Sequence, residues 1–319
     1  MDIKPDIFDE IEINGVKIHY EYFGKRNVPA IIINNGVAME TASWYQFLPQ
    51  ILEKVDVLLW DFRGQGRSTS DDQPYYIEDF SEYLKAIIDK LELKKEYTNL
   101  LGISFGCFPV VDFLRKYQDR VNKAIISGIV GTNDLVYKYQ AQLGKSIIER
   151  DLLDLWVDSL YGALFSSNFL KTIEPFIPKL KTALFERYKN RRTSLLRLIE
   201  AEERYVDKIE DYYSQFKKVQ TPILLVIGTE DRLTPPFVQK KLTKVFPNMY
   251  IKELEAGHVV YMEKPKEFFN SAIDFIKHNN FEKLKEWFYI KSLFFKKTLN
   301  LFFRVNSLFK NFKFILIKF

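Results

Sequence analysis

Apolar residues follow two different spacings along this chain, one typical of strands and one typical of helices. Apolar and polar residues alternate on both sides of Asn14-Gly15, which predicts a β-hairpin over residues 7–14 and 16–24. Later helix-like segments carry apolar residues three or four positions apart, as in residues 77–93. Between these segments, short apolar runs predict buried strands of a mostly parallel sheet at residues 30–34, 55–61, 97–104, 123–130, 222–227 and 249–254. The pattern predicts an α/β fold.

The alternation of strands and helices stops between two of the expected strands. Residues 133–216 show only helical spacing, which predicts a helical cap inserted into an α/β core of residues 1–132 and 217–281. We call this cap the insertion. It holds more large apolar residues than one solvated helical face needs, so some of them, Trp156 among them, are expected to line a pocket, although most can be explained by packing between helices.

A serine flanked by glycines lies where a predicted strand meets a predicted helix. The segment is Gly102-Ile103-Ser104-Phe105-Gly106, after strand 97–104 and before a helix-like stretch that begins near residue 108. In this spacing the serine occupies a sharp, strained turn with its hydroxyl exposed, and only small residues fit at the glycine positions. Ser104 is therefore the predicted nucleophile.

A serine nucleophile needs an imidazole to accept its proton. Of the three histidines, His19 lies in a predicted strand and His278 ends a helix-like stretch, which are structural positions. His258 instead follows strand 249–254 on a loop. Because loops at the carboxyl ends of strands carry the chemistry of α/β folds, His258 is the predicted base.

A carboxylate is needed to orient the imidazole. Glu230 and Asp231 are adjacent on the loop after strand 222–227, and Asp134 follows strand 123–130. We predict that Asp231 orients His258, with Glu230 and Asp134 as alternatives. A carboxylate without this role is expected to be solvated or to cap a helix.

The order Ser104, Asp231, His258 resembles that of the α/β-hydrolase family. Two further segments carry the resemblance: residues 61–68 are similar to the family's Asp-x-Arg-Gly-x-Gly-x-Ser turn, and Ala256-Gly257-His258 is similar to its histidine loop. The resemblance implies the α/β-hydrolase fold and a serine hydrolase that forms an acyl-enzyme.

The family resemblance also implies an oxyanion hole made of two backbone N–H groups. By resemblance the donors are Val37, in the loop after strand 30–34, and Phe105. Many family members have His-Gly in this loop, whereas this chain has Asn35-Gly36, which we expect to contact the substrate. The loop also resembles that of hydroxyacyl acyltransferases that make rhamnolipid precursors. In that subgroup either water or a hydroxyl attacks the acyl-enzyme.

The basic charge of the chain is concentrated in its last residues. Residues 282–319 hold nine Lys or Arg and two Glu, whereas the whole chain has a net charge of +5. The apolar residues of this tail follow helical spacing, with Lys and Arg interrupting them, so an amphipathic helix on an anionic membrane surface is expected rather than a membrane span. Packing against the protein itself or a second subunit, or an unstructured tail, are the alternatives. The main apolar positions are Trp287, Ile290, Phe294, Leu301, Val305, Leu308, Phe312, Ile315 and Phe319.

Other features of the sequence exclude several classes of protein. The first residues lack the pattern of a secretory signal and there is one cysteine, Cys107, so a cytoplasmic protein without disulfides is expected, at most peripheral on the membrane. No phosphate-binding glycine loop, metal-ligand cluster or nucleic-acid-reading motif occurs, so no cofactor, metal or nucleic acid is expected. Cys107 is expected to pack in the interior.

Together these features predict a serine hydrolase that acts on an ester or thioester with an apolar acyl group. Transfer of a (hydroxy)acyl group to an alcohol is the alternative within enzymes. A noncatalytic ligand-binding protein on the same fold is the alternative from another class.

Overall fold

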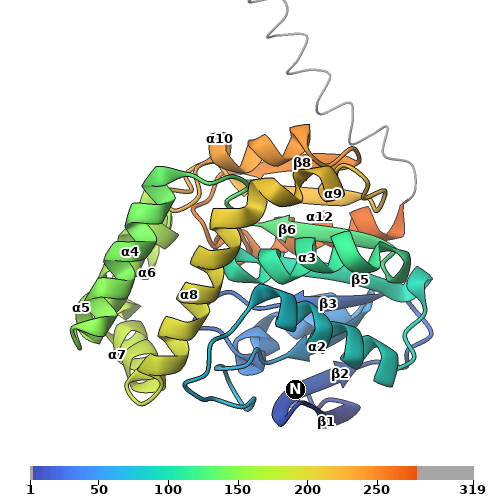
Figure 1. The fold of residues 1–319 in the computed structure, drawn as a ribbon, viewed down its shortest axis with the longest axis horizontal. Helices are drawn as coiled ribbons and strands as arrows, with labels where there is room; N and C mark the ends of the chain where they lie inside the picture. The colour runs from blue at the N-terminus through green and yellow to red at the C-terminus, as the bar shows by residue number, and fades with distance from the viewer. Residues whose placement is uncertain (1–2, 279–319) are drawn as a thin grey trace, which may run out of the picture. The chain divides into compact units, whose positions relative to one another are not determined.

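The computed structural model describes residues 3–278, which form an eight-stranded sheet in the order β1-β2-β4-β3-β5-β6-β7-β8 (Figure 1). β2 pairs antiparallel with β1 and β4, and all the other pairs are parallel. This confirms the predicted α/β-hydrolase fold with an N-terminal hairpin. The strands are β1 (Ile7–Ile13), β2 (Val16–Phe23), β3 (Ala30–Asn34), β4 (Asp56–Trp60), β5 (Thr98–Ile103), β6 (Lys123–Ser127), β7 (Ile223–Gly228) and β8 (Met249–Leu254).

The hairpin turn has the backbone geometry that its sequence predicts. Asn14 and Gly15 both have positive φ, 52° and 78°. These are the signs required at the two central residues of the turn that matches the twist of paired strands. The register then follows, with Ile13 opposite Val16.

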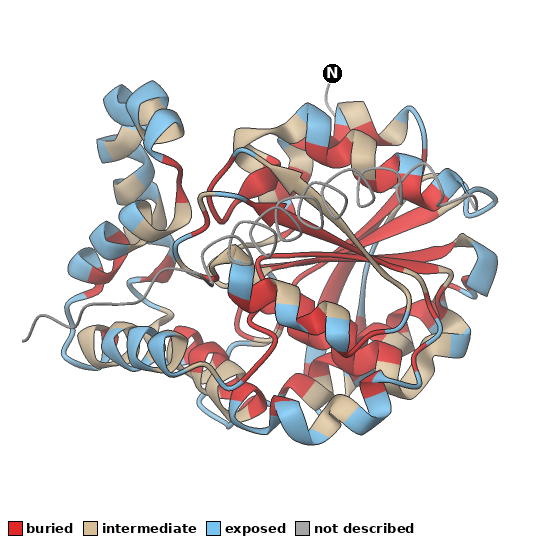
Figure 2. Cartoon of the chain, turned by 90° about the horizontal axis from the view of Figure 1, so that it is seen from above, coloured by how far each residue is buried: buried red, intermediate tan, exposed pale blue. Residues whose placement is uncertain are grey.

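Helices cover both faces of the sheet, and Figure 2 shows the buried strands between two helical layers. On one face α3 contacts β3, β5 and β6, and α2 and α9 contact α3; on the other, α1 contacts β4 and α12 contacts β7. β3 to β7 are buried along their whole length, as expected of parallel strands covered on both faces. The helices outside the insertion are α1 (Leu48–Leu52), α2 (Ile77–Lys90), α3 (Cys107–Tyr117), α10 (Pro236–Gln239), α11 (Val260–Glu263) and α12 (Pro265–Lys277), and α9 (Tyr213–Phe216) ends the insertion.

Two predicted elements end earlier than the sequence suggested. β6 stops at Ser127 rather than at Val130, because Gly128 has φ 78° and turns the chain out of the sheet. α2 stops at Lys90, and Glu92, with φ 51°, lies in the left-handed region after it. Apolar residues beyond these points, such as Leu93, are still buried, so hydrophobicity alone overestimated the elements.

The insertion is helical, and Figure 1 shows α4 to α7 gathered at one end of the sheet, whereas the short α9 lies beside α3. α4 contacts α5 and α8, and α5 contacts α7. The insertion has a small apolar core of its own, formed by Ile148, Leu153, Trp156, Val157, Tyr188, Leu195 and Ile199. Its helices are α4 (Leu135–Glu149), α5 (Leu153–Leu164), α6 (Ser167–Ile173), α7 (Ile177–Tyr188), α8 (Arg192–Lys208) and the short α9.

The predicted tail of residues 282–319 lies outside the described residues, so its membrane contact stays a prediction. The predicted domain boundaries stay predictions as well. Within residues 3–278, no helix is both long enough and apolar enough to cross a membrane.

The carboxyl ends of the parallel strands meet at one edge of the sheet, where glycines let backbones touch. A Cβ atom on Gly106 would lie 2.1 Å from the carbonyl oxygen of Asn34, at the end of β3. A Cβ atom on Gly102 would lie 2.7 Å from the carbonyl oxygen of Gly106. Because both contacts are to backbone, no side-chain rotation relieves them. The turn after β5 therefore requires both glycines.

We predict that Gly106→Ala destabilises the protein by about 3 kcal/mol, at the upper end of the cost of overpacking, because its Cβ has no space. Gly162→Ala is the matched control: Gly162 lies in α5, and a Cβ added there would meet nothing within 4 Å. This control should stabilise the protein slightly, since Ala favours helix. Urea unfolding measures both changes, and equal midpoints for the two variants would contradict the close-approach argument.

Candidate active site

Ser104 occupies the tip of the turn between β5 and α3. Its φ is +51°, a left-handed conformation that is uncommon for a residue with a side chain. The flanking glycines make this turn sterically accessible, and the hydroxyl-bearing side chain is partly exposed at a cavity. The structure thus gives Ser104 the strained geometry that the sequence predicts for a nucleophile.

Asp231 and His258 are hydrogen bonded to each other. The distance from His258 Nδ1 to Asp231 Oδ2 is 2.9 Å, and both side chains are buried. Because an ionised carboxylate only accepts, Nδ1 carries the proton and Nε2 is left as an acceptor. Nε2 is buried and has no hydrogen-bond partner in the described part of the chain. The pair is therefore set up to accept a proton at Nε2.

The Asp231 carboxylate is held in place by donors on its own loop. Oδ1 accepts from the backbone N–H groups of Leu233 and Thr234, at 3.0 and 2.8 Å. Oδ2 accepts from the Thr234 hydroxyl at 2.8 Å and from Gln239 Nε2 at 3.0 Å, in addition to His258. These hydrogen bonds fix the orientation of the carboxyl group. Asp231 is therefore a fixed hydrogen-bond partner for the imidazole.

The loops that carry Asp231 and His258 pack backbone against backbone. A Cβ on Gly228, at the end of β7, would lie 1.9 Å from the carbonyl oxygen of Gly257. The N–H of Glu230 donates to the oxygen of Ala256 at 2.9 Å. The insertion secures the same region, since the N–H of His258 donates to the oxygen of Leu164, the last residue of α5, at 2.8 Å.

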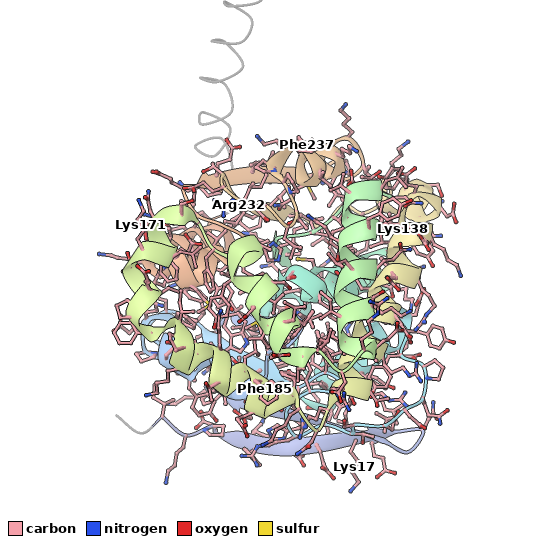
Figure 3. The ribbon with its side chains drawn as sticks, turned by 90° about the vertical axis from the view of Figure 1, so that its left-hand side faces the viewer. Lys17, Lys138, Lys171, Phe185, Arg232 and Phe237 are labelled. Atoms are coloured by element: carbon pink, nitrogen blue, oxygen red, sulfur yellow. The ribbon has the colours of Figure 1, made fainter. Side chains whose placement is uncertain are left out.

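Arg232, next to Asp231 in sequence, also links the Asp231 loop to the insertion. Its guanidinium donates to the carbonyl oxygen of Gly162 at 3.1 Å and to the Ser167 hydroxyl at 2.8 Å. Figure 3 views the molecule from this side and labels Arg232 among the insertion helices. The insertion is therefore attached directly to the loops that carry Asp231 and His258.

A cavity of about 320 Å³ lies between Ser104 and the insertion. Its walls are mostly apolar, and α4, α5 and α8 supply most of them. Trp156 is among the lining residues, as predicted, although it also packs in the apolar core of the insertion. The apolar lining residues are Val37, Ala141, Leu143, Gly144, Ile147, Trp156, Leu160, Ala163, Leu164, Ile199 and Leu233.

The structure brings Asp231 and His258 into contact and places Ser104 at the cavity, but no hydrogen bond joins Ser104 Oγ to His258 Nε2 within residues 3–278. In enzymes without substrate such hydrogen bonds are often long and tighten when substrate binds. The turn of Ser104 and the loop of His258 follow the carboxyl ends of β5 and β8, two parallel strands of one sheet. The predicted triad is thus geometrically accessible, and its catalytic role stays a prediction.

The loop after β3 lies beside Ser104. A Cβ on Gly36 would be 3.5 Å from the Cβ of Ser104, and Val37 lines the cavity together with Ser104. The N–H groups of Val37 and Phe105 therefore belong to the two segments that flank the serine. This position is compatible with their predicted role as oxyanion donors.

The Asn35 side chain does not support its predicted contact with substrate. It is buried; its Nδ2 donates to the oxygen of Trp60 at 2.9 Å, and its Oδ1 accepts from Trp44 Nε1 at 2.7 Å. Both ends of the amide are therefore used inside the protein. Asn35 holds the loop after β3 against β4 instead of facing the cavity.

The alternative carboxylates and the remaining cysteine have structural positions. Asp134 caps α4 by accepting from the N–H groups of Val136 and Tyr137, and Glu230 faces a surface hollow away from the cavity. Cys107 is fully buried behind Ser104, and burial raises the pKa of its thiol, so it stays protonated. His19 is buried in β2, and its Nε2 lies 3.0 Å from Glu21 Oε1.

Sequence reasoning missed four residues at the site. Thr234 and Gln239 donate hydrogen bonds to the Asp231 carboxylate. The position of Thr234, three residues after Asp231, only weakly indicates this contact, and the position of Gln239 does not indicate it. Tyr137 and Glu202 line the cavity from α4 and α8. No sequence pattern connects these two residues, because only the packing of the helices brings them together.

Comparison with known proteins matches residues 29–265 to the family described as alpha/beta hydrolase fold. The chain is 23% identical to 3-oxoadipate enol-lactonase 2 of Acinetobacter baylyi, over 83% of this chain and 95% of the relative. It is 22% identical to Carboxylesterase YbfK of Bacillus subtilis, over 81% of this chain and 83% of the relative.

Among solved structures, an alpha/beta hydrolase enzyme, MGS-M2, from a Medee basin deep-sea metagenome library superimposes with a TM-score of 0.78. It is 23% identical and covers 85% of this chain and 98% of its own. At this identity the likeness shows the fold alone. The family match extends from just before β3 to the start of α12 and thus includes Ser104, Asp231 and His258. The chain belongs to the α/β-hydrolase fold family and is an enzyme of the hydrolase class.

Proposed function

We propose that this hydrolase cleaves an ester or thioester with a largely apolar acyl group through an acyl-enzyme at Ser104. The observation that carries the proposal is the buried Asp231–His258 pair near a strained serine at an apolar cavity; the His258 Nε2 has no hydrogen-bond partner among residues 3–278. A serine, an imidazole and an oriented carboxylate are the side chains that acyl transfer through a serine uses.

In the proposed reaction, Ser104 Oγ attacks the carbonyl carbon while His258 Nε2 takes its proton. Asp231 stabilises the imidazolium that forms. The N–H groups of Val37 and Phe105 donate to the oxyanion, and each such donor typically lowers the barrier by about 3 kcal/mol. His258 then gives the proton to the leaving alcohol or thiol. Water, deprotonated by His258, releases the acid in the second half of the reaction.

The cavity favours an apolar acyl group over a small polar one. Side chains of Ile147, Trp156 and Leu160 form part of its wall, and burying each CH₂ of a substrate there contributes about 0.8 kcal/mol. The volume of about 320 Å³ lies at the lower end of the range of ligand pockets. A medium-length acyl chain therefore gains more from this cavity than an acetyl group does.

Asp231→Asn should lower kcat of ester hydrolysis by about 10⁴-fold, because an amide partner favours the wrong imidazole tautomer. Glu230→Gln is the matched control, since it removes the neighbouring carboxyl and should leave kcat unchanged. Fluorophosphonate labelling of Ser104 should show the same order of rates, with Ser104→Ala unlabelled. A larger loss for Glu230→Gln than for Asp231→Asn would contradict the assignment of the acid.

For p-nitrophenyl esters of increasing chain length, we expect kcat/KM to rise about fourfold per CH₂ until the cavity is full. Ala141→Trp, which fills part of the cavity, should shift the optimum to shorter chains, whereas Gln142→Trp, on the exposed side of α4, should not. Faster turnover of acetyl than of medium-chain esters would refute an apolar acyl site. Product analysis with an added alcohol separates hydrolysis from acyl transfer.

The basic tail adds a proposed membrane contact, supported by its net charge and apolar spacing. Removing residues 281–319 should abolish partitioning of the protein to anionic vesicles, measured by sedimentation. Neutral vesicles and high salt serve as controls, because both weaken electrostatic attraction of the full chain. Unchanged partitioning of the truncated protein would exclude the tail as the membrane contact.

A further inference from the structure

A carboxylic acid lines the mostly apolar cavity beside Ser104 and has no role in the proposed reaction. Glu202 lies on α8, close to one turn after Ile199, which also faces the cavity. Among the described residues that line the cavity, Glu202 is the only acid, and the other polar ones are Ser104, Tyr137, Gln140 and Ser159. A lone carboxyl at the substrate cavity requires an explanation.

Glu202 is hydrogen bonded across the cavity wall but has no cationic partner. The hydroxyl of Tyr137, on α4, donates to Glu202 Oε1. Within residues 3–278, no lysine, arginine or histidine forms an ion pair with Glu202. Its second oxygen, Oε2, is therefore left for a ligand.

The two lysines of α4 are engaged with other carboxylates. Lys138 pairs with Asp207 at 2.9 Å. Lys145 pairs with Glu200 and with Glu203, at 3.4 and 3.7 Å. Among the described residues, the neighbouring carboxylates are thus paired with lysines, whereas Glu202 has no counter-charge.

An unpaired carboxylate in apolar surroundings is unfavourable. Burial raises the pKa of Glu202 to about 7, against the hydrogen bond from Tyr137 and the electrostatic interaction with His258, which lower it. The nearby charge of Glu203 raises it further. A ligand that brings a positive charge into the cavity recovers this cost, whereas a neutral hydroxyl does not. The missing partner is therefore most simply a cation.

We propose that Glu202 and Tyr137 form a subsite that binds a protonated amine on the acyl part of the substrate. The inference rests on the proposed function, because the amine is bound while the scissile carbonyl lies at Ser104. Tyr137 fixes the carboxylate through Oε1, and Oε2 accepts from the ammonium group. The apolar walls contact the aliphatic carbons between the amine and the carbonyl.

The subsite can be tested by binding alone. Isothermal titration calorimetry of the full chain, at a pH above 7, compares a straight-chain primary alkylammonium with the alcohol of equal length. We expect the ammonium to bind about tenfold to a hundredfold more tightly, as is typical of hydrogen bonds to a charged group. Glu202→Gln should remove this preference and Tyr137→Phe should reduce it. Glu203→Gln, which changes the adjacent carboxyl outside the cavity lining, should retain it.

The pH dependence identifies the group that binds the amine. The ammonium needs the ionised carboxyl, so its affinity should fall about tenfold per pH unit as pH drops below about 7. The alcohol should show no such fall. The titratable groups that face Glu202 are Tyr137 from α4, Glu203 from α8, His258 from its loop and Cys107 from α3. Loss of the pH dependence in Glu202→Gln separates Glu202 from all four.

Turnover gives the complementary measurement. Two esters of equal chain length are compared, one of an acid with a terminal amine and one of the plain alkyl acid. The ratio of their kcat/KM values, amine over alkyl, measures the preference for the amine. Glu202→Gln should lower this ratio by the factor seen in binding. Equal affinity for ammonium and alcohol in the wild type, or an equal loss of both esters in the variant, would overturn the subsite. A protein that keeps the ammonium preference but shows no fluorophosphonate labelling would instead overturn the proposed function.

Discussion

Close contact between backbones at the carboxyl edge of the sheet determines the geometry of the whole site. Gly106 packs directly against the oxygen of Asn34, and Gly228 against that of Gly257, so the loop after β3 lies close against the turn after β5, and the loop after β7 close against the loop after β8. These contacts leave no room for side chains and allow little rotation. The serine is consequently held in its left-handed conformation, and the aspartate and histidine loops are held within hydrogen-bonding distance of each other.

The insertion contributes to the site in two ways. It provides most of the cavity wall, and it is hydrogen bonded to the loops of Asp231 and His258 through Arg232 and the Leu164 oxygen. In the proposed reaction the first role selects the acyl group and the second supports the imidazole. Because the same helices do both, changes in the insertion are expected to affect substrate preference and reactivity together. The proposed amine subsite, shared between α4 and α8, belongs to the first role.

Sequence patterns were informative wherever a short segment carried its own physical constraint. The Asn14-Gly15 turn, the buried strands and the glycines around Ser104 could be identified because steric and hydrophobic requirements act within a few residues. Strand and helix ends were less certain. β6 ended at Gly128 although apolar residues continue, since burial in the core does not require strand geometry. For Asn35, the type of side chain suggested a contact with substrate, whereas two tryptophans occupy its amide.

The sequence by itself determined the fold class, the strained turn of Ser104, and the loops on which Asp231 and His258 lie. Tertiary structure decided which carboxylate meets the imidazole, since Asp231 and Glu230 are adjacent and only the packing of two loops distinguishes them. It also decided that Glu202 faces the cavity with Tyr137 from a helix distant in the chain. Local propensities act over a few residues, whereas these contacts depend on how whole elements pack, which short-range spacing does not encode.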